Sequence, residues 1–126
     1  MDTKLKADVA ESAVMTRLLK NRFAVLKPIG DRLPYDLAVD IKGRLLRIQI
    51  KSAWKRNGSY YVDSRRTRTN RRVMMRKDYD KSDFDFAIIY LEDIELFYVM
   101  PIDVFLSYKS EITFVERQTR QRKPRS

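Results

Sequence analysis

The chain has 126 residues, with 27 Lys and Arg against 17 Asp and Glu, and a formal net charge of +10. Its length suits one compact domain, and its positive charge predicts a polyanionic partner. It contains neither Cys nor His, which excludes disulfides, thiolate zinc sites, iron–sulfur clusters, thiol nucleophiles and catalysis by imidazole. Its three glycines cannot build a phosphate-cradling loop of the Walker or dinucleotide type.

Two features bear on the cell compartment. No stretch approaches the roughly 18 apolar residues of a membrane-spanning helix. The first four residues, Met-Asp-Thr-Lys, lack the basic start and apolar stretch of a signal peptide. We therefore expect a cytoplasmic protein.

The first predicted elements are a helix and a short strand. Apolar side chains recur at helical spacing over residues 3–22, with Asp2 or Thr3 as the N-cap. Residues 23–27 are partly β-branched and are followed by Pro and Gly, which predicts a strand and then a turn.

Residues 35–41 and 46–51 alternate between apolar and polar side chains, and a Lys-Gly pair follows the first run, which predicts a β-hairpin. A turn of two or four residues makes Asp36 and Gln49 cross-strand neighbours, with side-chain roots roughly 5 Å apart. A three-residue turn would put apolar residues opposite polar ones, so the pattern itself selects the register. Lys51 lies on the same face as Gln49.

The second half of the chain is predicted to contain three further strands, a basic loop and a short helix. In chain order these are a strand over 59–62, an extended basic loop over 64–77, strands over 84–91 and 95–100, and a helix over 101–107. Residues 117–126 form a polar, basic tail, so the single domain is predicted to span residues 1–116. This order of elements predicts an α/β or α+β fold, with a mixed central sheet flanked by helices.

The polar face of the predicted hairpin carries groups suited to phosphodiester hydrolysis. Without His, this reaction can use a hard metal ion on carboxylates, with a Lys to stabilise charge. Mg²⁺ takes oxygen ligands and keeps several waters, so few protein ligands suffice. Asp36 can bind such a metal, Gln49 can supply an amide oxygen or hold a water, and Lys51 has the reach to meet the phosphate. Glu11 is a fourth candidate, because alanines beside it leave room for close helix–sheet packing.

These residues resemble the core of the PD-(D/E)XK nucleases. The resemblance rests on Pro34-Tyr35-Asp36, on Gln49-Ile50-Lys51 and on a preceding helix that carries Glu11. Their order, followed by the segment 83–90, is similar to that of Holliday-junction resolvases and of homing endonucleases of bacterial, cyanobacterial-type group I introns. The small size and the central basic segment make the homing endonucleases the closer match.

The resemblance implies a restriction-endonuclease-like core and a site-specific double-strand DNA endonuclease that uses Mg²⁺, with Mn²⁺ as a substitute. It implies that Asp36 and Glu11 bind metal together with the backbone carbonyl of Ile50, and that Lys51 is the catalytic lysine. Position 49 carries Gln where the motif usually has Asp or Glu, so a neutral ligand replaces a charged one. Some branches of the superfamily carry Gln there, and Gln49 stays in the predicted catalytic set.

DNA contact is predicted for basic side chains in two segments, because clustered positive charges call for an anion and Arg suits bidentate contact with guanine and phosphate. These residues are Lys55, Arg56, Arg65, Arg66, Arg68, Arg71, Arg72 and Arg76. The tail is expected to add phosphate attraction, and the protein is expected to join the nucleoid when bound to DNA. Cutting both strands needs two active sites, which implies a homo-oligomer. We expect a tetramer rather than a dimer, because long targets exceed the footprint of two small subunits.

Other interpretations stay open on the sequence alone. A Holliday-junction resolvase shares the core and would cut four-way junctions with little sequence preference. Gln49 favours a non-catalytic nucleic-acid-binding protein on a degenerate nuclease scaffold, and charge alone supports an RNA-binding protein. Charged residues that alternate along a strand are also usual on a solvated sheet face, and Glu11 can be an ordinary exposed helix residue.

Overall fold

The computed structural model describes residues 2–69 and 74–115. The predicted tail over 117–126 and two predicted DNA-binding residues, Arg71 and Arg72, lie outside the described residues. In chain order the elements are α1 (Thr3–Lys20), β1 (Ala24–Leu26), β2 (Leu37–Ile41), β3 (Arg44–Ser52), β4 (Trp54–Arg56), β5 (Ser59–Asp63), β6 (Arg65–Thr69), β7 (Met74–Asp78), β8 (Phe86–Leu91), the 3₁₀ helix η1 (Glu92–Ile94), β9 (Leu96–Pro101), α2 (Ile102–Leu106) and β10 (Glu111–Val115).

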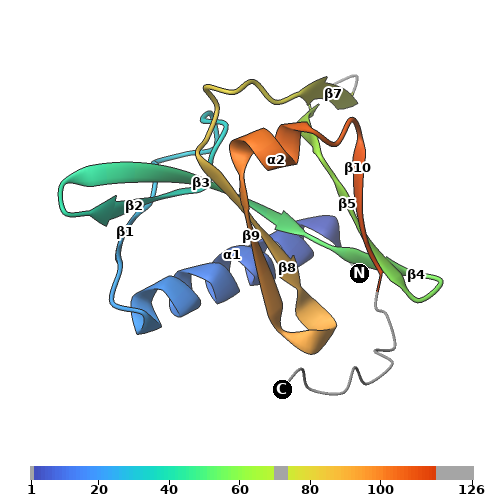
Figure 1. Ribbon diagram of the computed structural model, residues 1–126, viewed down its shortest axis with the longest axis horizontal. Coiled ribbons are helices and arrows are strands. Elements are labelled where there is room, and N and C mark those ends of the chain that lie inside the picture. Colours follow the sequence, from blue (N-terminus) through green and yellow to red (C-terminus); the bar gives the residue numbers. More distant parts are fainter. Residues whose placement is uncertain (1, 70–73, 116–126) are drawn as a thin grey trace, which may run out of the picture.

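A five-stranded mixed sheet forms the centre of the fold, in the order β1-β2-β3-β8-β9 (Figure 1). The hairpin β2–β3 has the predicted register, since Leu37 pairs with Ile48 and Ile41 pairs with Arg44. β3 and β8 run parallel, and the other neighbouring strands run antiparallel. The register was predictable because a shift by one residue would turn every apolar side chain to the other face.

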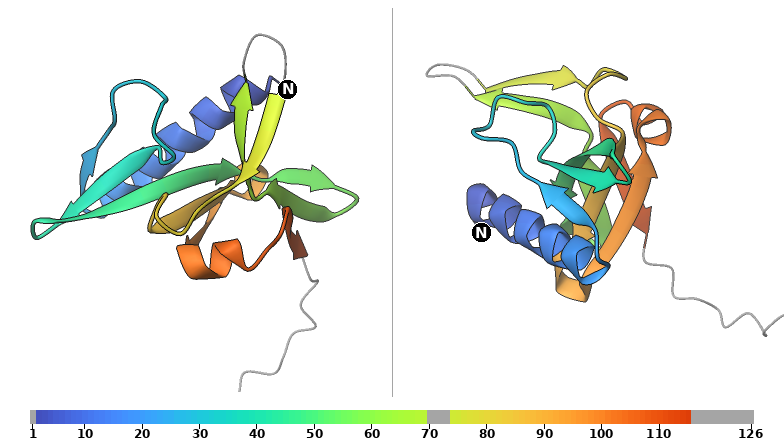
Figure 2. Two further views of the ribbon diagram at one scale, coloured as in Figure 1. Left: turned by 90° about the horizontal axis from the view of Figure 1, so that it is seen from above. Right: turned by 90° about the vertical axis from the view of Figure 1, so that its left-hand side faces the viewer.

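The helix α1 packs on one face of this sheet, as the right-hand view of Figure 2 shows. Its buried residues Ala10 and Val14 belong to a cluster with apolar side chains of β2, β3 and β8. The helix begins after its N-cap Asp2 and ends at Lys20, two residues earlier than predicted, because Arg22 adopts a left-handed backbone with φ 68°. Within the described part of the chain, no helix has both the length and the apolar character to cross a membrane.

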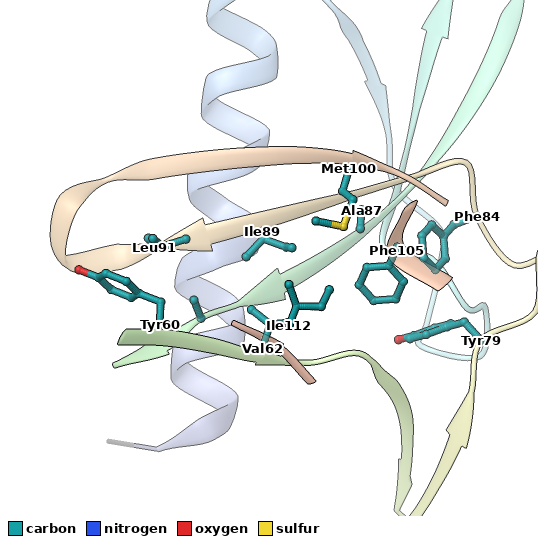
Figure 3. Packing of buried hydrophobic residues seen from close by; sticks show 11 residues of the cluster. Tyr60, Val62, Tyr79, Phe84, Ala87, Ile89, Leu91, Met100, Phe105 and Ile112 are labelled. Atoms are coloured by element: carbon teal, nitrogen blue, oxygen red, sulfur yellow. The ribbon is translucent and has the colours of Figure 1, made fainter. Parts of the chain in front are cut away.

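The opposite face of the sheet is covered by α2 and by a second sheet in the order β10-β5-β4 (Figure 2). Figure 3 shows the apolar cluster between these layers, in which Phe84, Ile89 and Phe105 are fully buried. Of the three strands in the second sheet, the sequence pattern predicts β5 alone. The strands β4 and β10 each pair with β5, and this tertiary pairing, more than their own short sequences, makes them strands.

A β-hairpin stands where an extended basic loop was predicted over residues 64–77. Its strands β6 and β7 pair antiparallel, from Arg65 with Asp78 at the root to Thr69 with Met74. The hairpin projects from the rest of the molecule (Figure 2). The loop prediction was wrong because residues 65–69 and 74–78 show none of the apolar alternation that marks a strand in sequence, and they form strands by pairing with each other.

Candidate active site

Asp36 stands directly before β2, where the chain enters the central sheet. Its backbone N–H donates a hydrogen bond to the carbonyl of Ile48 (2.8 Å). Its side-chain Oδ2 accepts hydrogen bonds from the backbone N–H of Ile50 (2.8 Å) and from Nε2 of Gln49 (3.0 Å). The structure therefore brings the two predicted cross-strand neighbours, Asp36 and Gln49, into direct contact.

Gln49 is buried and joins two of the oxygen atoms that were predicted to bind metal. Its Nε2 donates to Oδ2 of Asp36 and to the carbonyl of Ile50 (3.1 Å). The amide thus presents its N–H₂ group at this point, where an amide oxygen or a bound water was predicted. The two acceptors are the carboxylate of Asp36 and the carbonyl of Ile50, and the N–H₂ group that they bind carries partial positive charge. The electrostatic potential between these two oxygens therefore favours a positive charge.

Glu11 lies on α1 and forms an ion pair with Lys27, which follows β1. Burial of the Asp36 carboxyl raises its pKa most, the hydrogen bond from the N–H of Ile50 opposes this rise, and the negative charge of Glu11 adds to it. Glu11 and Asp36 are therefore close enough to couple electrostatically. The hydrogen bond to Glu11 in turn raises the pKa of Lys27. The ion pair between Lys27 and Glu11 could not be predicted from sequence, because the pattern of a short strand does not show which helix residue will lie next to it.

Lys51 lies on β3, and its ammonium group contacts the root of the β6–β7 hairpin. Its Nζ donates to the backbone carbonyl of Arg65 (3.0 Å) and lies 4.9 Å from the ring centroid of Tyr79. Burial lowers the pKa of Lys51 to about 8, although the carboxylates of Asp63 and Asp36 favour the charged form. A lysine with a lowered pKa beside carboxylates is typical of active sites. The neighbours from the hairpin were not predicted, because only tertiary folding brings them to β3.

The donor atoms at this point fit a hard divalent cation. The carboxylate of Asp36 and the carbonyl of Ile50 converge on one N–H₂ group, and Glu11 adds a second negative charge nearby. Over residues 2–69 and 74–115, no group of three or more His, Cys, Asp or Glu side chains could hold a metal ion. The protein would thus supply few ligands and water would supply the rest, an arrangement that Mg²⁺ favours.

The residues predicted to contact DNA fall on two hairpins, β4–β5 and β6–β7. On the first, Lys55 pairs with Asp93 (3.6 Å) and Arg56 pairs with Glu111 (3.2 Å). Both predicted DNA contacts on β4 therefore already have acidic partners within the chain.

On the second hairpin, Arg65 pairs with Asp63 (3.1 Å). Arg66 donates from Nη2 to the backbone carbonyl of Arg32 (3.3 Å). Two further predicted residues, Arg68 and Arg76, lie on β6 and β7. The hairpin root therefore lies beside Lys51 and beside the loop that leads to Asp36.

Comparisons with known proteins agree with this geometry. A family model described as PD-(D/E)XK endonuclease matches residues 1–126. A solved structure, described as that of the bacterial homing endonuclease I-Ssp6803I, is 57% identical to the chain with a TM-score of 0.85. The match covers 99% of this chain and 86% of that chain. A search among curated proteins gave no match. The family match spans all four predicted catalytic positions, which are Glu11, Asp36, Gln49 and Lys51.

Proposed function

The chain belongs to the PD-(D/E)XK endonuclease family, and from this premise we propose that it is a homing endonuclease of a bacterial group I intron. It would hydrolyse both strands of a specific DNA target. The observation that carries this proposal is the 57% sequence identity to a solved bacterial homing endonuclease, over 99% of this chain.

We propose Mg²⁺ as the cofactor, with Mn²⁺ as a substitute, since PD-(D/E)XK nucleases generally use divalent metal ions. Asp36, Glu11 and the backbone carbonyl of Ile50 would hold the ion. Bound there, it would stabilise the negative charge that develops on the phosphate and lower the pKa of a bound water.

Lys51 and Gln49 would position the reacting groups. An ammonium group has three N–H donors, and the carbonyl of Arg65 accepts one of them, so the group could also donate to the scissile phosphate or the attacking water. The N–H₂ group of Gln49 lies between the carboxylate of Asp36 and the carbonyl of Ile50, so the amide would turn aside when the ion binds these two oxygens and could then hold the attacking water. The contact with the carbonyl of Arg65 holds the ammonium group of Lys51 in advance, and a charge held in this way stabilises the transition state without reorganisation during the reaction.

The β6–β7 hairpin is the proposed DNA-binding element. A two-stranded β-ribbon fits the major groove, and residues 64–77 contain many basic side chains and no acid. DNA bound along the hairpin would lie next to the active site, since the root of the hairpin contacts Lys51. Residues 117–126 would add attraction to phosphates.

We propose that the protein acts at the nucleoid in the cytoplasm as a homo-oligomer, and as a tetramer rather than a dimer. One subunit carries one such site, whereas a double-strand cut needs two. Light scattering at the protein concentration of the cleavage assay would measure the mass of the assembly. A mass of four subunits is expected, and a monomer that cuts both strands would contradict the proposal.

Cleavage assays with matched variants test the proposed site. Asp36→Asn and Lys51→Ala are each expected to slow single-turnover cleavage by at least about 10²-fold. The control is Asp40→Asn on β2, because the Asp40 carboxylate faces the hairpin turn, where it accepts a hydrogen bond from the N–H of Gly43 (2.8 Å). This control is expected to cut like the wild type. The substrate is a plasmid library with randomised inserts, assayed with Mg²⁺, Mn²⁺ or EDTA beside a synthetic four-way junction.

The outcomes separate the competing functions. Metal-dependent cutting of selected plasmids that Lys51→Ala abolishes supports a homing endonuclease. Cutting of four-way junctions with no selection of inserts indicates a Holliday-junction resolvase. Tight metal-independent binding without cutting indicates a binding protein on a nuclease scaffold, the interpretation that Gln49 favours.

A further inference from the structure

Both ends of one hairpin meet at the ammonium group of Lys51. Arg65, whose carbonyl accepts the hydrogen bond from Nζ at 3.0 Å, is the first residue of β6. Tyr79, whose ring centroid lies 4.9 Å from Nζ, directly follows Asp78, the last residue of β7. Arg65 and Asp78 also form the pair at the root of the hairpin ladder. The two strands of the proposed DNA-binding element therefore converge on the proposed catalytic lysine.

The apolar core fixes the ring of Tyr79. Tyr79 is 8% exposed and makes edge-to-face contacts with Phe84 (5.2 Å) and Phe105 (5.8 Å). Figure 3 shows these three rings together at one end of the buried cluster. The face of an aromatic ring attracts an ammonium group, and the attraction grows where water is excluded. Because the core holds the ring in place, the ring restricts where the ammonium group of Lys51 can lie.

A further contact links the hairpin to the other half of the site. Arg66, the second residue of β6, donates to the carbonyl of Arg32 (3.3 Å). Arg32 lies in the loop that leads to Asp36. A shift of the hairpin root would therefore act on Lys51 and on the segment that carries the proposed metal ligand.

We propose that Tyr79 is a positioning residue for Lys51, and that DNA bound to the β6–β7 hairpin sets the position of the ammonium group through the two ends of the hairpin. This inference rests on the proposed catalytic role of Lys51. The carbonyl of Arg65 orients one N–H bond, and the ring of Tyr79 holds the group from a second direction. A displacement of about 1 Å at a catalytic group can slow a reaction about 10²-fold. Tyr79 therefore affects the rate without touching DNA.

A series of rings at position 79 tests the role of Tyr79. Tyr79→Phe keeps the ring face and removes the hydroxyl. Fluorinated phenylalanines at the same position keep nearly the same shape, while they weaken and then reverse the charge distribution that attracts a cation. We expect Tyr79→Phe to cut within about threefold of the wild type at saturating DNA, and the most fluorinated ring to slow cleavage about 10- to 100-fold. DNA affinity in EDTA is expected to stay within about twofold across the series.

The series has defined contradicting outcomes. The series can be interpreted even if Tyr79→Leu fails to fold, because the fluorinated rings keep the packing against Phe84 and Phe105. A rate that stays constant across the series, or that falls as far in Tyr79→Phe as in the fluorinated variants, overturns the role of the ring. A parallel loss of rate and affinity indicates packing alone and also overturns it. Lys51→Ala separates the two proposals. If it cuts like the wild type, the catalytic role of Lys51 fails, whereas an inactive Lys51→Ala with a constant ring series removes only the role of Tyr79.

NMR spectroscopy tests the coupling to DNA in the wild-type protein. Because Nζ of Lys51 lies 4.9 Å from the ring centroid of Tyr79, the adjacent ε-methylene protons are expected to show a ring-current shift that Tyr79→Leu removes. Adding the selected target DNA in EDTA is expected to change this shift in the wild type more than in Tyr79→Leu. An equal change in both proteins, or no change with DNA fully bound, overturns the coupling through the hairpin.

Discussion

The two basic hairpins, β4–β5 and β6–β7, differ in what neutralises their positive charge. On β4, Lys55 and Arg56 pair with Asp93 and Glu111, which come from distant segments of the chain. Their cationic groups also lie against aromatic rings of β5, at 5.4 Å and 4.2 Å from the ring centroids. The positive charges of this hairpin therefore contribute to the packing of the second sheet.

The β6–β7 hairpin has a different balance of charge. Residues 64–77 contain no acid; the nearest acids along the chain are Asp63, the last residue of β5, which pairs with Arg65, and Asp78, the last residue of β7. It projects from the molecule (Figure 2), whereas β4–β5 pairs with β10. Two segments of similar basic composition thus differ in how their charges are paired, and we expect this difference to decide which one binds DNA. We expect the DNA-binding segment to be the one whose own sequence places many basic residues together without an acid among them, as residues 64–77 do.

The largest expected effect separates the two hairpins by DNA affinity. Arg66→Ala with Arg68→Ala is expected to weaken DNA binding about 10- to 100-fold at about 0.1 M salt, and to lower the slope of log affinity against log salt by about 2. Lys55→Ala with Arg56→Ala removes the same charge from β4–β5 and is expected to change affinity less than about threefold. Fluorescence anisotropy over a salt titration in EDTA measures both. Equal losses in the two double variants would show that both hairpins bind DNA.

The half of the site on β2 and β3 could be predicted from sequence because local alternation determines it. The parity of apolar residues fixes the register of the hairpin, and the register places Asp36 beside Gln49, as the structure confirms. The same parity puts Lys51 on the face of Gln49. The direction of the Gln49 amide does not follow from parity, because it depends on the carbonyl of Ile50 next to it.

The half of the site that comes from the hairpin root could not be predicted in this way. Tyr79 and the carbonyl of Arg65 contact Lys51 only after β6 and β7 have paired and the chain has returned to the core. Lys27 likewise meets Glu11 only through the packing of α1 beside β1. Contacts of this kind depend on tertiary distances, which carry no periodic signal in the sequence. The strands β4 and β10 were missed for the same reason.

A second prediction concerns stability. We expect a substitution in β4–β5 to lower the free energy of unfolding more than a substitution in β6–β7, the reverse of their expected effects on DNA affinity. Tyr60 on β5 is 3% exposed, and its hydroxyl donates to the carboxylate of Asp93 at 2.7 and 2.9 Å. Tyr60→Phe is expected to lower the free energy of unfolding by about 1 kcal/mol. Arg66→Ala on β6 is expected to lower it by less than about 0.5 kcal/mol. Urea denaturation measures both, and a larger loss in Arg66→Ala would show that the β6–β7 hairpin also has a structural role.

The contribution of Tyr60 is expected to depend on pH. Its hydrogen bond lowers the pKa of Asp93, with a further contribution from Lys55. Because the pKa is lower in the folded state, this stabilisation is complete above the ordinary carboxyl pKa and is lost as the pH falls through the lowered value. The difference in stability between wild type and Tyr60→Phe should therefore be constant from about pH 5 to 7 and shrink below about pH 4. A difference that grows in acid would exclude the carboxylate as the acceptor.

The smallest expected effect lies at Ser64, between β5 and β6, where the second sheet meets the hairpin. Its N–H donates to the carbonyl of Ser110 (3.1 Å), and its buried Oγ has no hydrogen-bond partner among the described residues. Ser64→Ala removes a buried polar group without breaking a bond, so it should leave stability unchanged or raise it by less than about 1 kcal/mol. The matched control is Ser52→Ala, whose hydroxyl donates to the carbonyl of Lys6 (3.3 Å) and whose loss should destabilise by about 0.5 kcal/mol.

DNA affinity and cleavage rate measured on the same two variants show where the DNA-binding element begins. Both variants are expected to bind and cut DNA within about twofold of the wild type. A loss of affinity in Ser64→Ala, with stability intact, would mean that its buried hydroxyl acts in the DNA-bound state. The functional hairpin would then begin at the end of β5, before Arg65, and the boundary between the two basic regions would move toward the second sheet.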